Sequence, residues 1–306
     1  MPCYNEEAVL PETARRLGAK LRALIDGRKV SGESRVLLVN DGSKDRTWEG
    51  IAALHEADKL FSGVCLSRNR GHQNALLAGL MTAKELADFT ISMDADLQDD
   101  IDAVDAMVDK YLQGCDIVYG VRSKRTTDSF FKRFTAEGFY RLIRGLGGEV
   151  VFNHADYRLM SRRALDALSE YGETNLFLRG IVPMLGYKTA VVEYERGERF
   201  AGESKYPLRK MLSFAMEGVT SLSDRPLKLI TAAGGLSLLA AVVLLVVFLA
   251  GTAFGRPILG WRILLFAVIF MGGLLLLALG ALGEYVGKTY LEVKHRPRYF
   301  ISETLL

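Results

Sequence analysis

The amino-acid sequence predicts an α/β domain with a mostly parallel sheet and flanking helices, followed by a juxtamembrane amphipathic helix and a two-helix transmembrane hairpin. Two observations carry this prediction: apolar β-branched runs alternate with segments of helical periodicity early in the chain, and two long uncharged runs lie near its end. We expect a cytosolic domain over residues 1–200, a basic segment with the juxtamembrane helix over 201–228, two spans within 229–283, and a cytosolic tail over 284–306.

Four short runs have the length and β-branched composition of strands, and four longer segments carry apolar residues at helical spacing. The strand-like runs are 35–39, 63–66, 89–93 and 116–119, and the helical segments are 6–25, 45–57, 73–87 and 101–112. This alternation favours a mostly parallel sheet with helices on both faces. Such sheets bind ligands at the carboxyl ends of their strands, where polar clusters begin at Asn40, Ser67 and Asp94.

Two uncharged runs, 229–250 and 263–283, predict membrane-spanning helices. A helix rises about 1.5 Å per residue, so about 20 apolar residues match a hydrocarbon core about 30 Å thick. Lysines and arginines flank both outer ends, whereas the loop between the runs has only Arg256 and Arg262. We therefore expect a multi-pass protein of the inner (cytoplasmic) membrane with its α/β domain and both termini in the cytoplasm. The alternative is a pair of helices buried in a soluble core.

The composition argues against several other classes. The chain has 306 residues, of which 49% are hydrophobic and 25% charged, which argues against wholesale disorder. Its 39 Lys and Arg against 36 Asp and Glu give a net charge of +3, too small to indicate nucleic-acid binding. The three cysteines are an odd number without metal-ligand spacing, which suits a reducing cytosol.

The Asp-Ala-Asp-Leu-Gln segment after the third strand-like run is a candidate metal site. Side chains alternate along an extended segment, so Asp94 and Asp96 project to one side and Gln98 can reach the same region. Two carboxylates and an amide oxygen suit Mg²⁺ or Mn²⁺, with phosphate oxygens and water as the remaining ligands. Asp99 and Asp100 fit the start of the next helix. The alternative is that all four acids serve as caps and surface charge.

Three motifs and the two predicted spans together resemble a known family. The motifs are Pro2-Cys-Tyr-Asn-Glu6, Asn40-Asp-Gly-Ser43 and Asp94-Ala-Asp-Leu-Gln98. They are similar to those of family 2 glycosyltransferases that act on polyprenyl phosphate, relatives of dolichol-phosphate mannose synthase and bacterial undecaprenyl-phosphate glucosyltransferases. The resemblance implies a GT-A-like fold and a Mg²⁺ or Mn²⁺ cofactor. It further implies inverting transfer of one sugar from a nucleoside diphosphate sugar, with UDP-glucose or a related UDP-sugar favoured, to polyprenyl (undecaprenyl) phosphate.

The resemblance also implies roles for residues on the donor side. In similar enzymes the first motif borders the nucleobase, the second contacts base or ribose, and the third holds the metal that bridges the diphosphate. The implied nucleotide-sugar residues are Pro2, Tyr4, Glu6, Asp41 and Asp94, and the implied metal ligands are Asp94, Asp96 and Gln98, with Asp96 also catalytic.

On the acceptor side, Asp156 matches the position assigned to a catalytic carboxylate. It would either orient the attacking phosphate through neighbouring cations or take up its residual proton, because a phosphate monoester is already anionic near neutral pH. The alternative is a structural salt bridge to Arg158 or Arg179.

A basic segment just before the first span resembles the family's Arg-x-x-Gly-x-Ser-Lys-Tyr segment. Arg199, Ser204 and Lys205 would bind the diphosphate, the lipid phosphate or both, with Arg199 also catalytic, and Arg122 and Arg179 are further phosphate or acceptor candidates. The alternative is a basic patch attracted to anionic lipid. The apolar stripe over 207–223 would lie in the membrane interface or pack on the domain.

Three further expectations concern completeness, function and assembly. A family member normally has a hydrophobic strand before the Pro-x-Tyr-Asn-Glu motif, so we expect the sheet to lack a strand beside residues 36–39 and the true start to lie upstream. The alternative is that this form is compromised in folding and base binding. A processive polysaccharide synthase would carry a Gln-x-x-Arg-Trp segment, which is absent. The remaining alternative function is a non-catalytic scaffold or a lipid-linked sugar translocator. Glycines of the second span would allow the hairpin to form homo-oligomers.

Overall fold

The computed structural model describes residues 1–122, 154–174, 176–195, 225–253 and 260–306. The α/β part comprises β1 (Pro2–Cys3), α1 (Leu10–Asp26), β2 (Val36–Asn40), α2 (Thr47–Ala57), β3 (Phe61–Leu66), α3 (His72–Lys84), β4 (Phe89–Ser92), α4 (Ala103–Leu112), β5 (Ile117–Arg122), β6 (His154–Ser161), α6 (Arg162–Ser169), α7 (Leu178–Met184) and β7 (Thr189–Tyr194). The last part comprises α9 (Arg225–Ala253), α10 (Gly260–Val293) and β8 (Ile301–Leu305). The four strands and four helices expected between residues 6 and 119 are confirmed, with shifts at their ends.

The strands form two four-stranded sheets, in the orders β1-β2-β3-β8 and β4-β6-β5-β7. Parallel pairing joins β1 to β2, β2 to β3 and β5 to β7, whereas β3–β8, β4–β6 and β5–β6 are antiparallel. The expectation of a mostly parallel sheet is therefore wrong, and the α/β fold has mixed sheets. The reason is that β6 enters between β4 and β5 in the opposite direction, and the end of the chain adds β8 at an edge.

Helices cover both faces of the strands, as predicted. Val118 of β5 packs in a cluster with Leu17 of α1 and Met107 of α4. Its neighbours Ile117 and Tyr119 pack instead in a cluster with residues of α3, α6 and α7. Successive side chains of a strand point to opposite faces, so one strand supplies both layers of the core.

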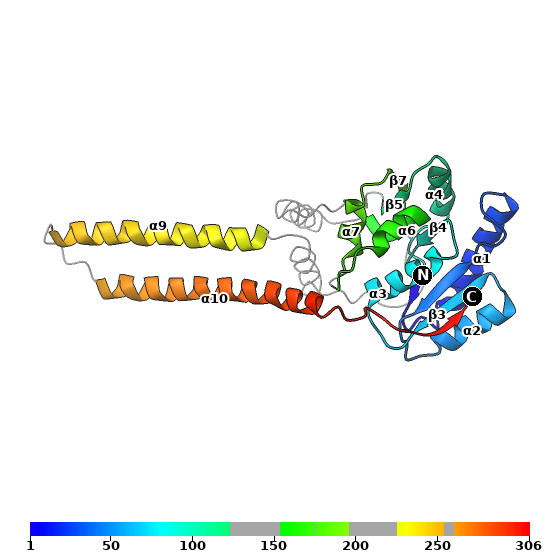
Figure 1. Ribbon diagram of the computed structural model, residues 1–306, viewed down its shortest axis with the longest axis horizontal. Coiled ribbons are helices and arrows are strands. Elements are labelled where there is room, and N and C mark those ends of the chain that lie inside the picture. The colour runs from blue at the N-terminus through cyan, green and yellow to red at the C-terminus, as the bar shows by residue number, and fades with distance from the viewer. Residues whose placement is uncertain (123–153, 175, 196–224, 254–259) are drawn as a thin grey trace.

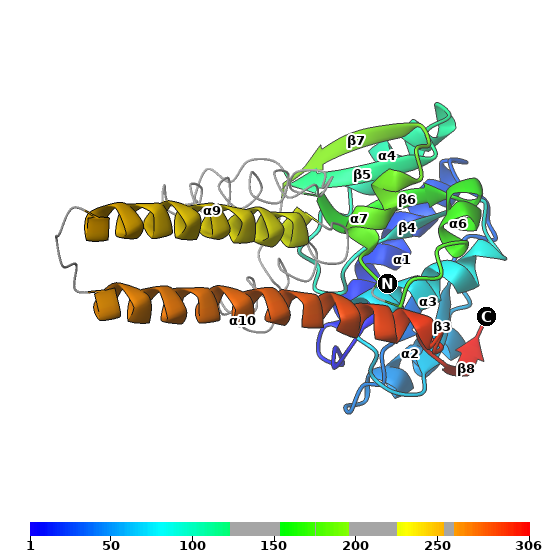
Figure 2. The same cartoon turned by 60° about the vertical axis from the view of Figure 1, so that its left-hand side comes forward.

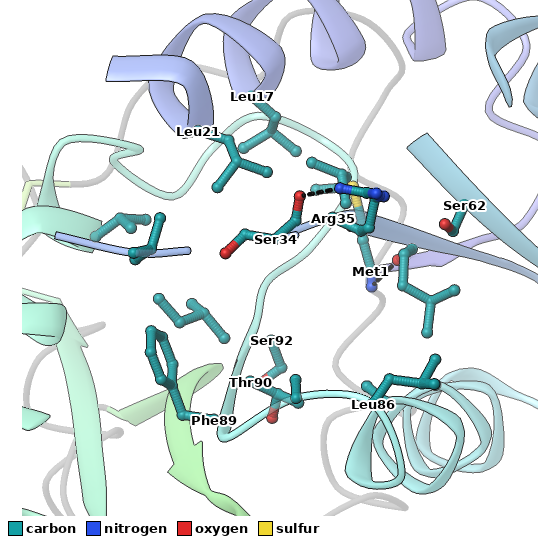
Figure 3. A pocket seen from close by; sticks show the side chains of 18 of the residues that line it. Met1, Leu17, Leu21, Ser34, Arg35, Ser62, Leu86, Phe89, Thr90 and Ser92 are labelled. Atoms are coloured by element: carbon teal, nitrogen blue, oxygen red, sulfur yellow. Dashed lines mark hydrogen bonds between the residues drawn. The ribbon is translucent and has the colours of Figure 1, made fainter. Parts of the chain in front are cut away.

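A cavity of about 670 Å³ lies between β2 and β4 (Figure 3). Strand β1 pairs with Val39 and Asn40 through its two residues, while Val36 and Leu37 of β2 line the cavity. From the other side the cavity is lined by Phe89 and the remaining residues of β4. The expected absence of a strand beside residues 36–39 is therefore wrong in part, because β1 pairs with β2 and the amino group of Met1 donates to the carbonyl of Leu37 at 2.9 Å. An upstream start of the chain stays a prediction.

Helices α9 and α10 run side by side away from the α/β part (Figures 1 and 2). They contain the two predicted spans, 229–250 and 263–283. Within the described residues, one segment, Ile263–Val293, is long and apolar enough to cross a membrane. The crossing by α9 stays a prediction, and the juxtamembrane stripe over 207–223 lies outside the described residues.

After α10 the chain returns along the α/β part to pair β8 with β3 (Figure 2). Glu292 near the end of α10 accepts a hydrogen bond from the backbone N–H of Thr174 at 2.7 Å. Farther along, Glu303 of β8 accepts one from the indole N–H of Trp48 at 3.1 Å. These contacts tie the end of α10 and strand β8 to the α/β part.

Candidate active site

Polar residues meet at the carboxyl ends of β2, β3 and β4, where the sequence placed the candidate site. Asp41 follows β2 and contacts Arg70 and Gly71, which precede α3. His72 at the start of α3 then contacts Asp94, which follows β4. These contacts join three loops that are separated in the sequence.

Asp41 holds the loop between β3 and α3. The side chain is 2% exposed, and its two oxygens accept the backbone N–H groups of Arg70 at 2.7 Å and Gly71 at 2.9 Å. Burial raises the pKa of the Asp41 carboxyl. The next residue, Gly42, has φ +60°, and a Cβ there would lie 2.4 Å from the backbone N of Asn69. The predicted contact of Asp41 with base or ribose stays a prediction.

The first motif lies beside the loop that follows β2. The backbone N–H of Asn5 donates to Ser43 Oγ at 3.0 Å, and Asn5 Oδ1 accepts the backbone N–H of Lys44 at 2.9 Å. Pro2 is buried in β1, whereas Tyr4 is 41% exposed beside these turns. The structure thus brings the two predicted donor-side motifs together.

Asp94 and Asp96 lie in the turn after β4. Burial, together with the charges of nearby carboxylates, raises the pKa of Asp94. Asp96 Oδ1 accepts the backbone N–H of Gln98 at 3.2 Å, with Leu97 between them at φ +56°. A divalent cation would relieve the repulsion among these carboxylates, and their hard oxygen atoms fit Mg²⁺ or Mn²⁺. Among the described residues, no three His, Cys, Asp or Glu side chains form a complete metal site by themselves.

Asp156 on β6 is the centre of a buried ionic cluster and is 3% exposed. Arg179 of α7 donates to it from Nη2 at 3.0 Å and from Nε at 3.3 Å, and His72 Nε2 lies 3.3 Å from Oδ2. Burial alone would raise the pKa of Asp156, but His72 and Arg179 hold it well below its usual range. His72 also lies 3.6 Å from Asp94 and therefore connects the donor-side carboxylate to Asp156.

Arg158, two residues along β6, is fully buried at 1% exposure. Its Nη2 lies 3.9 Å from Asp156 Oδ1, and its guanidinium carbon lies 5.5 Å from the centre of the Tyr119 ring. Within the described part of the chain, its Nε and Nη2 atoms have no hydrogen-bond partner. Burial lowers the pKa of Arg158. Asp156 therefore lies between two guanidinium groups, and the predicted salt bridges to Arg158 and Arg179 are both present.

Arg122 ends β5 on the same edge. Its Nη2 donates to Asp99 Oδ1 at 3.3 Å and its Nε to the hydroxyl of Tyr194 at 3.2 Å. The expectation that Asp99 begins the next helix is wrong, because α4 begins at Ala103 and Asp99 is 4% exposed beneath Arg122.

The structure brings most of the predicted site residues to one edge. His72 joins Asp94 to Asp156, and Arg179 contacts Asp156 directly. The sequence reasoning missed His72 and Gln73, which also contacts Asp156. A glycine followed by polar residues after a predicted strand was the available signal for these two. Arg199, Ser204 and Lys205 lie outside the described residues.

The α/β fold thus carries a candidate site at its strand ends, formed by an acidic turn and the arginines around Asp156. Residues 1–169 match the family Glycosyl transferase family 2, and the chain belongs to this family. It is a glycosyltransferase. The family match and the mixed α/β sheets agree with the GT-A-like fold that the resemblance implied.

Relatives match almost the whole chain. It is 50% identical over 303 residues to the uncharacterized glycosyltransferase YkoT of Bacillus subtilis, covering 99% of this chain and 90% of that protein. It is 38% identical over 313 residues to the prophage bactoprenol glucosyl transferase homolog of Escherichia coli, covering 99% and 97%. It is also 38% identical over 313 residues to the bactoprenol glucosyl transferase of Shigella phage SfV, covering 99% and 96%.

Two solved structures are more distant. Glucosyl-3-phosphoglycerate synthase from Mycobacterium tuberculosis, in complex with Mn²⁺, UDP-glucose and phosphoglyceric acid, is 18% identical with a TM-score of 0.45, covering 73% of this chain and 77% of that one. The mannosyltransferase PcManGT from Pyrobaculum calidifontis, in complex with GDP-mannose and Mn²⁺, is 18% identical with a TM-score of 0.42, covering 95% and 83%.

Proposed function

We propose that this glycosyltransferase moves one glucose, or a related sugar, from its UDP derivative to polyprenyl (undecaprenyl) phosphate with inversion at the anomeric carbon. The observation that supports it best is that His72 connects the acidic turn at Asp94 with the arginines around the buried carboxylate of Asp156. One half suits a metal-bound diphosphate and the other a phosphate monoester. The names of the bactoprenol glucosyl transferase relatives agree with this acceptor.

The position of the site supports a membrane-bound acceptor. The carboxyl ends of β5 and β7 face the side from which α9 and α10 extend (Figure 2). The segment Ile263–Val293 has the length and hydropathy of a membrane span. A polyprenyl phosphate has its headgroup at the membrane surface, so an edge that faces the helix pair can reach it. We place the α/β part and both termini in the cytoplasm, with both helices crossing the inner membrane.

On the donor side, the chain supplies binding and orientation. Tyr4 and Glu6, on the segment that packs against the turn after β2, border the nucleobase. Asp41, whose backbone N–H donates to the carbonyl of Cys3 at 2.9 Å, holds the loop before α3. When bound at Asp94, Asp96 and Gln98, Mg²⁺ or Mn²⁺ would neutralise negative charge on the departing diphosphate. Arg122, which Asp99 and Tyr194 orient, is close enough to this edge to contribute positive charge.

On the acceptor side, an oxygen of the lipid phosphate attacks the anomeric carbon in line with the bond to the diphosphate. A new carbon–oxygen bond forms, the bond to the diphosphate breaks, and its electron pair leaves with the nucleotide. Arg179 holds the attacking phosphate, and Arg199, Ser204 and Lys205 are proposed to complete its binding site. Direct attack without an enzyme nucleophile accounts for the inversion.

Transfer of label from donor to lipid tests this proposal. The full chain in lipid nanodiscs is incubated with radiolabelled UDP-glucose, undecaprenyl phosphate and Mg²⁺, and the organic extract is counted. We expect lipid-soluble label that EDTA abolishes and that Asp96→Asn reduces to a small fraction. The control Asp166→Asn, an exposed partner of Lys84 at 3.4 Å, should behave as the unaltered protein. No label from UDP-glucose, other UDP-sugars or GDP-mannose would refute the proposal and favour a non-catalytic scaffold or translocator.

A further inference from the structure

The hydrogen-bonding capacity of Asp156 is occupied by side chains of the protein. Oδ2 accepts from Arg179 Nη2 at 3.0 Å, lies 3.3 Å from His72 Nε2, and accepts from Gln73 Nε2 at 3.5 Å. Oδ1 accepts from Arg179 Nε at 3.3 Å and faces Arg158 Nη2 at 3.9 Å. A carboxylate offers about four lone-pair positions, and a general base needs one directed at the substrate proton. Because Asp156 is only 3% exposed, it does not present a lone-pair position to the acceptor.

The side chains that donate to Asp156 lie on α3 and α7, so this carboxylate connects both helices to β6. Gln73 lies on α3, and its Oε1 accepts the backbone N–H of Leu178 at 3.1 Å. Leu178 is the first residue of α7, and Arg179 follows it directly. Asp156 on β6 therefore fixes the start of α7 through Gln73 and also fixes the orientation of the Arg179 side chain. An arginine held through two nitrogen atoms has a defined orientation.

Arg179 and His72 are the donors of the cluster that solvent reaches. Arg158 and Arg179 together bring two positive charges to Asp156, and Asp94 faces the cluster through His72 at 3.6 Å. Arg158 is sealed at 1% exposure, whereas the side chains of Arg179 and His72 are 31% and 43% exposed. A ligand that arrives from solvent can therefore reach Arg179 and His72 but not Arg158 or Asp156.

We propose that Asp156 is a positioning residue that presents Arg179 and His72 to the phosphate of the acceptor and takes no proton during the reaction. This inference rests on the proposed function and assigns its acceptor contacts. A phosphate monoester has its second pKa near about 6 and is mostly a dianion at neutral pH. The dianion attacks the anomeric carbon without giving up a proton, so the reaction needs cations beside the attacking oxygen and no general base.

Kinetics and binding of four forms of the full chain in nanodiscs test this assignment: the unaltered protein, Arg179→Ala, Asp156→Asn and the double variant. The readouts are kcat, the acceptor KM, and the Kd of farnesyl phosphate, a short polyprenyl phosphate, by calorimetry. We expect Arg179→Ala and Asp156→Asn each to weaken acceptor binding by about 10- to 100-fold. The double variant should bind the acceptor no more weakly than the weaker-binding of the two single variants. Methylguanidinium should partly restore Arg179→Ala but not the double variant, which lacks the carboxylate that holds the cation.

Other outcomes overturn the assignment. If Asp156→Asn lowers kcat while the acceptor KM and the Kd of farnesyl phosphate stay unchanged, Asp156 acts on the reaction itself. Rescue of the double variant by methylguanidinium would contradict positioning as well. Should Asp156→Asn fail to fold by circular dichroism, Gln73→Leu replaces it: positioning predicts a raised acceptor KM with kcat retained, and an unchanged KM contradicts it.

The calorimetric readout separates this inference from the proposed function. If the unaltered protein makes no lipid-linked sugar yet binds farnesyl phosphate through Arg179 and Asp156, the proposed function fails and the positioning role stands. If transfer is normal and Arg179→Ala leaves acceptor binding unchanged, the positioning role fails and the proposed function stands. Asp166→Asn serves as the surface control in both measurements.

Discussion

Replacing Asp156 by asparagine is expected to lower the free energy of unfolding by about 3–5 kcal/mol, because it leaves a buried arginine without a counter-charge. Asp156 is 3% exposed and Arg158 is 1% exposed, and Arg158 Nη2 lies 3.9 Å from Asp156 Oδ1. Coulomb's law at this distance with an effective dielectric constant of about 20 gives about 4 kcal/mol, which agrees with that range. The variant Asp156→Asn/Arg158→Met removes both charges, so we expect about 2–3 kcal/mol of the loss to be recovered.

Urea unfolding of the detergent-solubilised chain measures these energies, with Trp48 fluorescence as the probe in a Trp261→Phe background. Because the folded pKa of Asp156 lies below its unfolded value, its stabilisation is fully present above about pH 4 and is lost as the pH falls through the folded pKa. Burial lowers the pKa of His72, but its contact with Asp156 outweighs burial and raises it, so the stabilisation from this pair is fully present below the unfolded histidine pKa of about 6.5 and is lost as the pH rises through the folded pKa. The difference between the unaltered protein and Asp156→Asn should therefore be larger at pH 5 than at pH 8. A single-variant cost below about 1 kcal/mol, or strict additivity in the double variant, would refute the reasoning.

Three further predictions concern the fold around the site. Gly42→Ala should lower the free energy of unfolding by more than about 2 kcal/mol and reduce nucleotide binding, because φ is +60° and the new Cβ would lie 2.4 Å from the backbone of Asn69. Thermal unfolding and UDP titration check this prediction, and an unchanged Tm would contradict it. Burial raises the pKa of Cys3 to about 12, so only about 10⁻⁴ of the thiol is ionised at pH 8. Mass spectrometry should therefore find Cys3 alkylated in urea but not in the native protein, and rapid labelling of the native protein would show that β1 opens. Removal of Ile301–Leu305 uncovers the edge of β3 and removes the partner of the Trp48 indole, so Tm should fall and light scattering rise, whereas unchanged values would show that β8 does not stabilise the sheet.

The early part of the fold was predictable because local pattern and final environment agree there. Strand β2 is an apolar run that becomes buried, and the segments between strands have helical periodicity. Strand β6 escaped prediction because Asp156 and Arg158 occupy buried positions where the alternation rule expects apolar side chains. Their mutual neutralisation makes those positions tolerable, and this depends on α3 and α7, which local sequence does not reveal.

The other missed elements depend on pairing over long separations. Strand β8 has a polar, exposed pattern, and its position is set by pairing with β3, more than two hundred residues earlier. Within the site, Asp94, Asp156 and Arg179 were identifiable by residue type and motif. His72 was not, because a histidine at the start of a helix has no distinctive pattern until β4 and β6 place carboxylates on either side of it.

The mass of the lipid product tests the central claim most directly. Purified full chain in nanodiscs is incubated with UDP-glucose, undecaprenyl phosphate and Mg²⁺, and the extracted lipid is analysed by mass spectrometry. We predict a species heavier than the acceptor by one anhydrohexose, formed in step with free UDP and absent with Asp96→Asn. An unaltered acceptor beside folded protein that still binds UDP-glucose, or a hexose attached to any molecule other than the lipid phosphate, would contradict the assignment of this site to polyprenyl phosphate.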